Sequence, residues 1–141
     1  MNGSELTRHL IDVCAYQVEK VFEGITEDNA DLRVNEHCMS PRETLVHLGE
    51  CMEALLASMR GEQHSWGSYK PGDTAVEALL KSFREARSVV REKLAAAGDD
   101  AETLKHTGDF IALHEPYHVG QMASFRLTHT PGWDPYSIYP S

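Results

Sequence analysis

The sequence has no long hydrophobic run and no recognisable export signal. No apolar stretch approaches the roughly 20 residues that a membrane-spanning helix needs. The first residues, Met1–Glu5, lack the basic start and the apolar block of a secretion signal. The chain is therefore expected to be cytoplasmic and to have no membrane partner.

Basic residues are scarce, because 13 Lys and Arg stand against 22 Asp and Glu, for a formal net charge of −9. Proteins that bind nucleic acids gain most of their affinity from basic side chains that displace counterions from phosphates. The few Lys and Arg are scattered along the chain. This composition argues against a nucleic-acid partner and against an anionic membrane surface.

The three cysteines, Cys14, Cys38 and Cys51, are odd in number and share no C-x-x-C spacing. A disulfide framework or a zinc knuckle is therefore not expected. Cys14 and Cys51 fall within helical patterns, where they are expected to be small buried hydrophobic residues. Cys38 follows His37 in a polar stretch, where metal binding or reactivity is conceivable but not favoured.

Strand patterns are missing too, and helical periodicity recurs four times instead. The predicted helices cover about residues 4–23, 40–60, 73–97 and 107–128, with polar or turn-rich segments between them. Four amphipathic helices in 141 residues predict an all-α fold, a four-helix bundle that forms a single domain over residues 1–141.

The second helix has the sharpest start. Ser40-Pro41-Arg42-Glu43 supplies an N-cap, a proline at the first helical position and a glutamate at N3, which together make a capping box. The first helix is less distinct. It places Leu6, Leu10, Val13 and Val21 at helical spacing and stops at Gly24.

The most informative stretch is His114-Glu115-Pro116-Tyr117-His118-Val119-Gly120-Gln121. In a helix, His114 and His118 lie one turn apart, and two imidazoles so placed can bind one divalent metal ion. Both histidines and Gln121 fall on the apolar side of this helix, where polar groups need partners. Core histidines that hydrogen-bond to neighbours are the competing explanation.

Pro116 lies between these two histidines, where it removes a backbone donor and crowds the carbonyl of Ala112. Either the helix kinks there, or it begins near Glu115 with His114 just outside.

A third ligand would have to come from a facing helix. His47 is the remaining histidine within a well-defined helix, although it lies on the flank of the apolar stripe, where a boundary histidine is equally expected. Glu50, about one turn further on, is a weak candidate for a general base, with a solvated surface glutamate as the alternative.

Two segments carry a resemblance to a known family: Ser40-Pro41-Arg42-Glu43-Thr44-Leu45-Val46-His47-Leu48 and His114-x-x-x-His118-x-Gly120-Gln121. Through them the sequence resembles the DinB/YfiT-like family over nearly the whole chain. The resemblance implies a bundle with an up-down-down-up arrangement of right-handed sense. It also implies that His47, His114 and His118 bind a metal. Many relatives form homodimers, so a homodimer is expected.

The family includes metal-dependent enzymes, among them thiol-dependent S-transferases. The resemblance therefore implies an S-transferase, or a related hydrolase or isomerase, that acts on a small molecule with a low-molecular-weight thiol. Three imidazoles leave a metal position open, and zinc is expected first, with nickel or iron as alternatives. Gln121 is a candidate for orienting an imidazole or a metal-bound water. The alternative is a non-catalytic, metal-binding or small-ligand-binding stress-response bundle.

Overall fold

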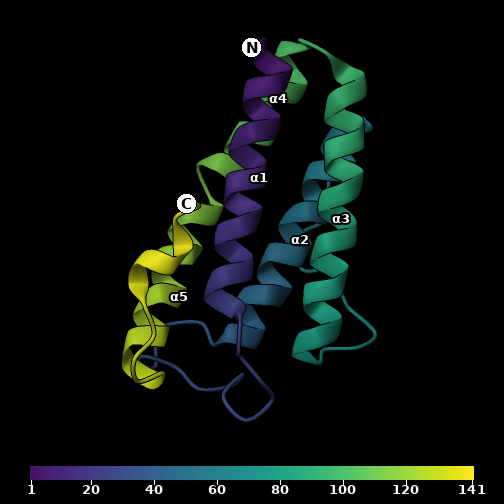
Figure 1. The fold of residues 1–141 in the computed structure, drawn as a ribbon. Coiled ribbons are helices and arrows are strands. Elements are labelled where there is room, and N and C mark those ends of the chain that lie inside the picture. The colour runs from purple at the N-terminus through teal and green to yellow at the C-terminus, as the bar shows by residue number, and fades with distance from the viewer.

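The protein folds into helices and turns without any strand, as Figure 1 shows for the computed structural model, which describes residues 1–141. None of the helices is both long and apolar enough to span a membrane. The elements in chain order are α1 (Gly3–Phe22), α2 (Pro41–Met59), α3 (Val76–Ala97), α4 (Ala101–Thr107), the π-helical turn η1 (Gly108–Ala112), α5 (Glu115–His129) and the 3-10 turn η2 (Pro135–Ile138).

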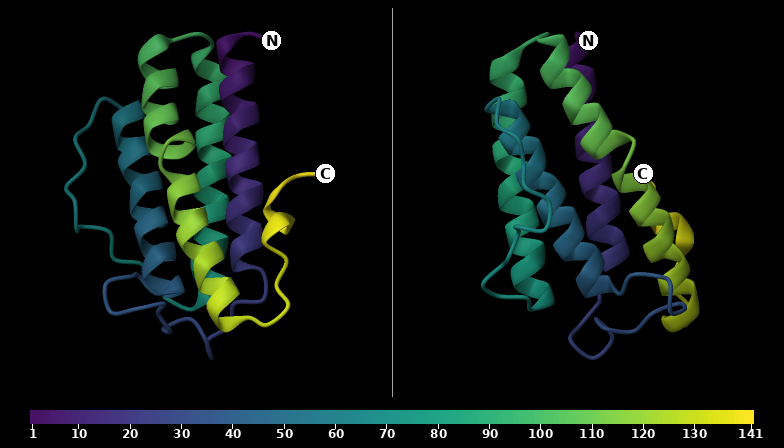
Figure 2. Two further views of the ribbon diagram at one scale, coloured as in Figure 1. Left: turned by 90° about the vertical axis from the view of Figure 1, so that its left-hand side faces the viewer. Right: turned by 180° about the vertical axis from the view of Figure 1, so that it is seen from behind.

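Four rods make up the bundle, and α4, η1 and α5 together form the fourth (Figure 1). In both figures α1 runs in one direction, α2 and α3 run in the opposite one, and the fourth rod returns parallel to α1. The expected all-α bundle and its up-down-down-up order are thus confirmed. Because α2 and α3 are parallel, residues 60–75 form a linker that travels back along the length of the rods (Figure 2).

The helix starts follow local capping chemistry. At α2, the Ser40 side chain accepts a hydrogen bond from the Glu43 backbone N–H (3.2 Å), and the Glu43 carboxylate accepts one from the Ser40 N–H (3.1 Å). This confirms the predicted capping box. A second capping box, formed by Asn2 and Glu5, starts α1 and was not foreseen from the sequence.

The core is one cluster to which every rod contributes. Cys14 is buried in this cluster and Cys51 is buried outside it, so both are buried as expected, and Cys38 is half-buried in the loop before α2. Of the α1 residues at helical spacing, Val21 is buried, whereas Leu6 and Leu10 are 49% and 43% exposed. The residues of α1 that are buried in the core are Ile11, Cys14, Val18, Val21 and Phe22.

The fourth rod begins earlier than its sequence pattern suggested, at Ala101 rather than near Thr107. Asp100 caps α4 by accepting a hydrogen bond from the Thr103 backbone N–H (3.0 Å), and Leu104 packs against the core. The polar turn expected over these residues is therefore helical. The rod then breaks midway, as Figure 2 shows, just before Pro116, where the sequence predicted either a kink or a new helix start.

Candidate metal centre

Three histidine side chains from two rods meet at the break. His47 Nε2 of α2 lies 3.1 Å from His114 Nε2, which in turn lies 2.9 Å from His118 Nε2 of α5. The three ligand atoms all lie within 4.8 Å of one another. No other set of three or more His, Cys, Asp or Glu side chains converges in this way.

The break determines where His114 lies. In the π-helical turn the Leu113 N–H bonds to the carbonyl of Gly108 (3.0 Å), and the His114 N–H then bonds to that of Ile111 (3.2 Å). α5 starts afresh at Glu115, with Pro116 in its first turn, where a missing N–H costs nothing. The second alternative for Pro116 is therefore the observed one, with His114 just outside α5.

Gln121 selects the tautomer of His118. Its Oε1 lies 2.9 Å from His118 Nδ1 and accepts the proton of that nitrogen, which leaves the Nε2 lone pair free. His114 Nδ1 is buried without a hydrogen-bond partner, and the nearby Phe110 backbone carbonyl raises the pKa of that imidazole against a larger lowering by burial. Both rings place Nε2 at the common point.

Burial keeps the three imidazoles neutral. It lowers the pKa of His47 and of His114, and the neighbouring imidazole of His47 lowers that of His114 further. The pKa of His118 falls to about 4, mainly through burial and then through the charges that His114 and His47 would carry. Neutral imidazole is the form that binds a metal.

The donor set fits a divalent ion. Three nitrogens about 2.0–2.1 Å from one zinc ion, at tetrahedral angles, lie roughly 3.4 Å apart. The observed separations of 3.1 and 2.9 Å need to open by only a few tenths of an ångström. Three nitrogen donors leave at least one position of a tetrahedral ion for a substrate or water.

A thiol lies beside this cluster. Cys51 Sγ is 3.7 Å from His47 Nε2, one helical turn further along α2. Burial, and then the charges of Glu115 and Glu50, raise the pKa of Cys51 to about 12. Without a metal, the Cys51 thiol therefore stays protonated at neutral pH. In that state Cys51 lines the wall of the site and is not a nucleophile.

A buried ion pair holds the restart of α5, and the sequence analysis missed it. The Glu115 carboxylate is fully buried and pairs with Arg87 of α3, which also donates to the Ile11 carbonyl of α1 (2.7 Å). Burial raises the pKa of Glu115, and the Arg87 charge opposes that rise. The available signal was Arg87 itself, an arginine in line with Phe83 and Val90 on the apolar stripe of α3.

Glu50 is neither free nor solvated. Its side chain is 15% exposed, and Oε1 accepts hydrogen bonds from His64 Nε2 (3.0 Å) and the Gly67 N–H (2.5 Å), both in the linker. The bond from His64 is the main reason that the pKa of Glu50 is lowered. A carboxylate with this pKa and these partners is a poor general base, and its visible role is to hold the linker on α2.

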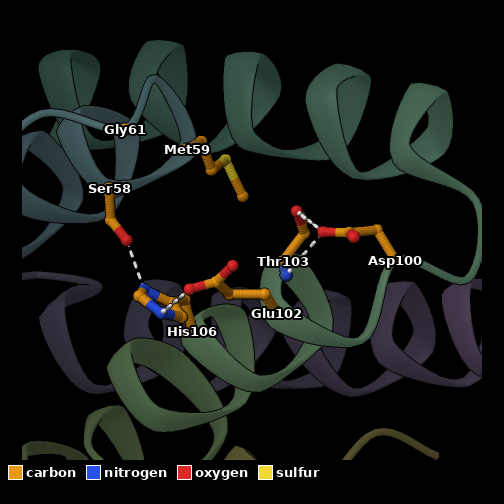
Figure 3. Close-up of a pocket in the computed structure, with 7 residues that line it drawn as sticks. All are labelled: Ser58, Met59, Gly61, Asp100, Glu102, Thr103 and His106. Carbon is orange, nitrogen blue, oxygen red and sulfur yellow. Dashed lines mark hydrogen bonds and ion pairs between the residues drawn. The ribbon is translucent and has the colours of Figure 1, made fainter.

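A second polar cluster lies at the α4 end of the bundle, around a cavity of about 210 Å³ (Figure 3). The Ser58 hydroxyl donates to His106 Nδ1, and Glu102 Oε1 lies 3.8 Å from His106 Nε2. The cluster has one histidine and no third ligand atom that converges with it.

Comparison with known proteins finds a family but no individual relative. Residues 10–125 match the sequence profile of the DinB superfamily. No curated protein and no solved structure matches the chain. The matched region includes α2, the break and all three histidines.

Proposed function

Because the chain belongs to the DinB superfamily and brings three histidine nitrogens together, we propose that it is a metal-dependent enzyme that joins a low-molecular-weight thiol to a small electrophile. His47, His114 and His118 would hold the ion. The convergence of their Nε2 atoms across two rods is the observation that carries the proposal. Zinc is the first choice, and nickel and iron also suit three imidazoles.

When bound, a divalent ion supplies positive charge that favours the thiolate over the thiol of a substrate. The residues of this chain provide the surroundings for that chemistry. Gln121 keeps the proton of His118 on Nδ1, and burial keeps the three imidazoles neutral. The proposed nucleophile is the thiol of the substrate, and Cys51, whose Sγ lies 3.7 Å from His47 Nε2, lines the wall of the site.

Metal content tests the site directly. Untagged wild-type protein, after reconstitution with zinc, nickel or iron and gel filtration, should retain about one equivalent of metal by mass spectrometry, and His118→Ala less than about a tenth of that. His37→Ala is the matched control, because His37 is 85% exposed and lies outside the cluster. Equal retention by His118→Ala and wild type, or no retention by either, would overturn the assignment.

Turnover separates an enzyme from a non-catalytic bundle. Thioether formation from glutathione or cysteine and a small electrophile should need both the thiol and the metal, and should be lost in His118→Ala. Stoichiometric metal without such turnover, over a panel of thiols, would favour the metal-binding stress-response alternative.

The homodimer and the cytoplasmic location rest on the family and on composition alone, and they stay predictions. Light scattering on untagged protein tests the oligomeric state.

A further inference from the structure

The linker between α2 and α3 is fastened to α2 close to the candidate metal centre. Glu50, which holds His64 and the Gly67 N–H, lies three residues after His47 on α2. Tyr69 packs so closely on Gly49 that a Cβ atom there would lie 2.8 Å from the tyrosine hydroxyl. The linker thus rests directly on the helix that carries His47.

The same linker reaches the fourth rod through an aromatic pair. The Trp66 ring lies parallel to that of Phe110 in η1, with an interplanar angle of 8° and ring centroids 6.4 Å apart. Phe110 precedes His114 by four residues, about one turn. The linker therefore spans from α2 to η1, and on each side it is attached about one turn away from a histidine of the cluster.

Trp66 is held in place but not covered. The imidazole of His64 packs edge-on against it, with centroids 5.0 Å apart and planes at 84°, and the Glu50 carboxylate holds that imidazole in turn. Trp66 is nevertheless 59% exposed. An exposed aromatic ring that packs against two other rings offers a surface on which small planar ligands can stack.

We propose that Trp66, backed by Phe110 and His64, is the stacking surface for the electrophile, and that the electrophiles of this protein are planar aromatic molecules. This inference rests on the proposed thiol transfer. For an activated aryl halide the thiol sulfur bonds to the ring carbon that carries the halogen. The carbon–halogen bond breaks, halide leaves with the bonding electrons, and the thiol proton goes to solvent.

Binding can be measured without turnover. The protein has two tryptophans, so Trp66 is the sole one in Trp133→Phe and Trp133 is the sole one in Trp66→Phe. Quenching of Trp66 fluorescence by 1,3-dinitrobenzene, which has no leaving group, should saturate. Quenching of Trp133 should rise linearly with concentration. Linear quenching of equal slope in both variants would overturn the proposal.

Kinetics then test specificity. With 1-chloro-2,4-dinitrobenzene and glutathione, Trp66→Leu should raise KM about tenfold, whereas Trp66→Phe should stay within about threefold of wild type, because stacking needs an aromatic ring. The KM for iodoacetamide, an aliphatic electrophile, should stay the same in both variants. Equal changes in KM for the two electrophiles would contradict a stacking role.

The two proposals fail in different ways. Fluorescence titration of metal-free and zinc-loaded Trp133→Phe reports stacking alone, and metal content reports the histidine site alone. Stoichiometric metal without saturable quenching would contradict the proposed stacking surface and leave the metal-centre proposal intact. Saturable quenching in a protein that retains no metal would support the stacking surface and contradict the proposed metal-dependent enzyme.

Discussion

The two rods that supply the candidate ligands are built differently. α2 runs without interruption from its capping box to Met59 and contributes His47. The fourth rod changes from α-helix to π-helical turn and back, and it contributes His114 and His118 on either side of the restart at Glu115. A rigid helix thus faces a broken one, and the break brings two consecutive imidazoles of one rod to the same point.

The two rods also differ in what determines their shape. The start of α2 is set by side chains within three residues of each other. The restart of α5 is set by Glu115, whose partner Arg87 comes from α3 and also binds the backbone of α1. Local chemistry therefore defines the first rod, and contacts between rods define the second.

The largest expected effect comes from breaking the buried pair. Glu115→Gln leaves the Arg87 charge buried without its anion, which should lower the free energy of unfolding by about 3–5 kcal/mol in urea titrations followed by circular dichroism. Glu85→Gln, at an exposed pair on α3, should cost less than about 1 kcal/mol. The double change Arg87→Met with Glu115→Met should recover much of the loss. Equal losses for the two glutamates would refute this account of the restart.

A smaller effect, confined to the metal, is expected from Gln121→Ala. Without the Oε1 acceptor the His118 ring is free to change tautomer, and zinc affinity measured by chelator competition should fall about 10–100-fold. Gln121→Glu keeps an acceptor and should retain most of the affinity. Gln63→Ala, in the exposed linker, serves as the control. Unchanged affinity in Gln121→Ala would show that another contact orients His118.

Removal of the α2 cap should give the converse result. Ser40→Ala should cost about 1 kcal/mol of stability and leave zinc affinity unchanged, because the cap lies almost two turns before His47. Ser88→Ala, at an exposed position of α3, should be within about 0.5 kcal/mol of wild type. A large loss of zinc affinity in Ser40→Ala would mean that the position of His47 also depends on this cap.

The stability of the metal-free protein should also depend on pH. The pKa of His118 is lowered from 6.5 to about 4, so between these values the unfolded chain takes up a proton that the folded protein does not. Proton uptake by the unfolded chain lowers the free energy of unfolding. The contribution of neutral His118 to stability is therefore fully present above the ordinary histidine pKa and is lost as the pH falls towards about 4. Thermal midpoints should drop on acidification through this range, and less steeply in His118→Ala. A midpoint that stays constant or rises would contradict the assignment.

Much of the arrangement could be predicted from the sequence because it depends on neighbours along the chain. Helical periodicity located the four rods, and Ser40 with Glu43 placed the start of α2. His114 and His118 lie one turn apart in any helical backbone, so their proximity could be predicted from spacing. The position of His47 across from them came from a family resemblance, since periodicity placed it only at the edge of a stripe.

The features that sequence reasoning missed or mistook depend on other rods. Leu6 and Leu10 have helical spacing but are exposed, because the neighbouring rods pack on the face of α1 that contains Ile11 and Val18. From the sequence, Glu50 was expected to be a solvated surface residue. In the structure the linker folds back onto it, and His64 and the Gly67 N–H donate hydrogen bonds to its carboxylate.

The sequence by itself determined the helical content, the capped start of α2 and the identity of the imidazoles, since propensity, capping and spacing act over a few residues. Only the tertiary structure decided which of the two alternatives at Pro116 holds, which acidic group is buried and where Trp66 rests. Burial of Glu115 is tolerable only beside Arg87, and Trp66 and Phe110 become neighbours only after the linker has returned along α2. These outcomes follow from desolvation and packing between segments far apart in the chain, which no local pattern encodes.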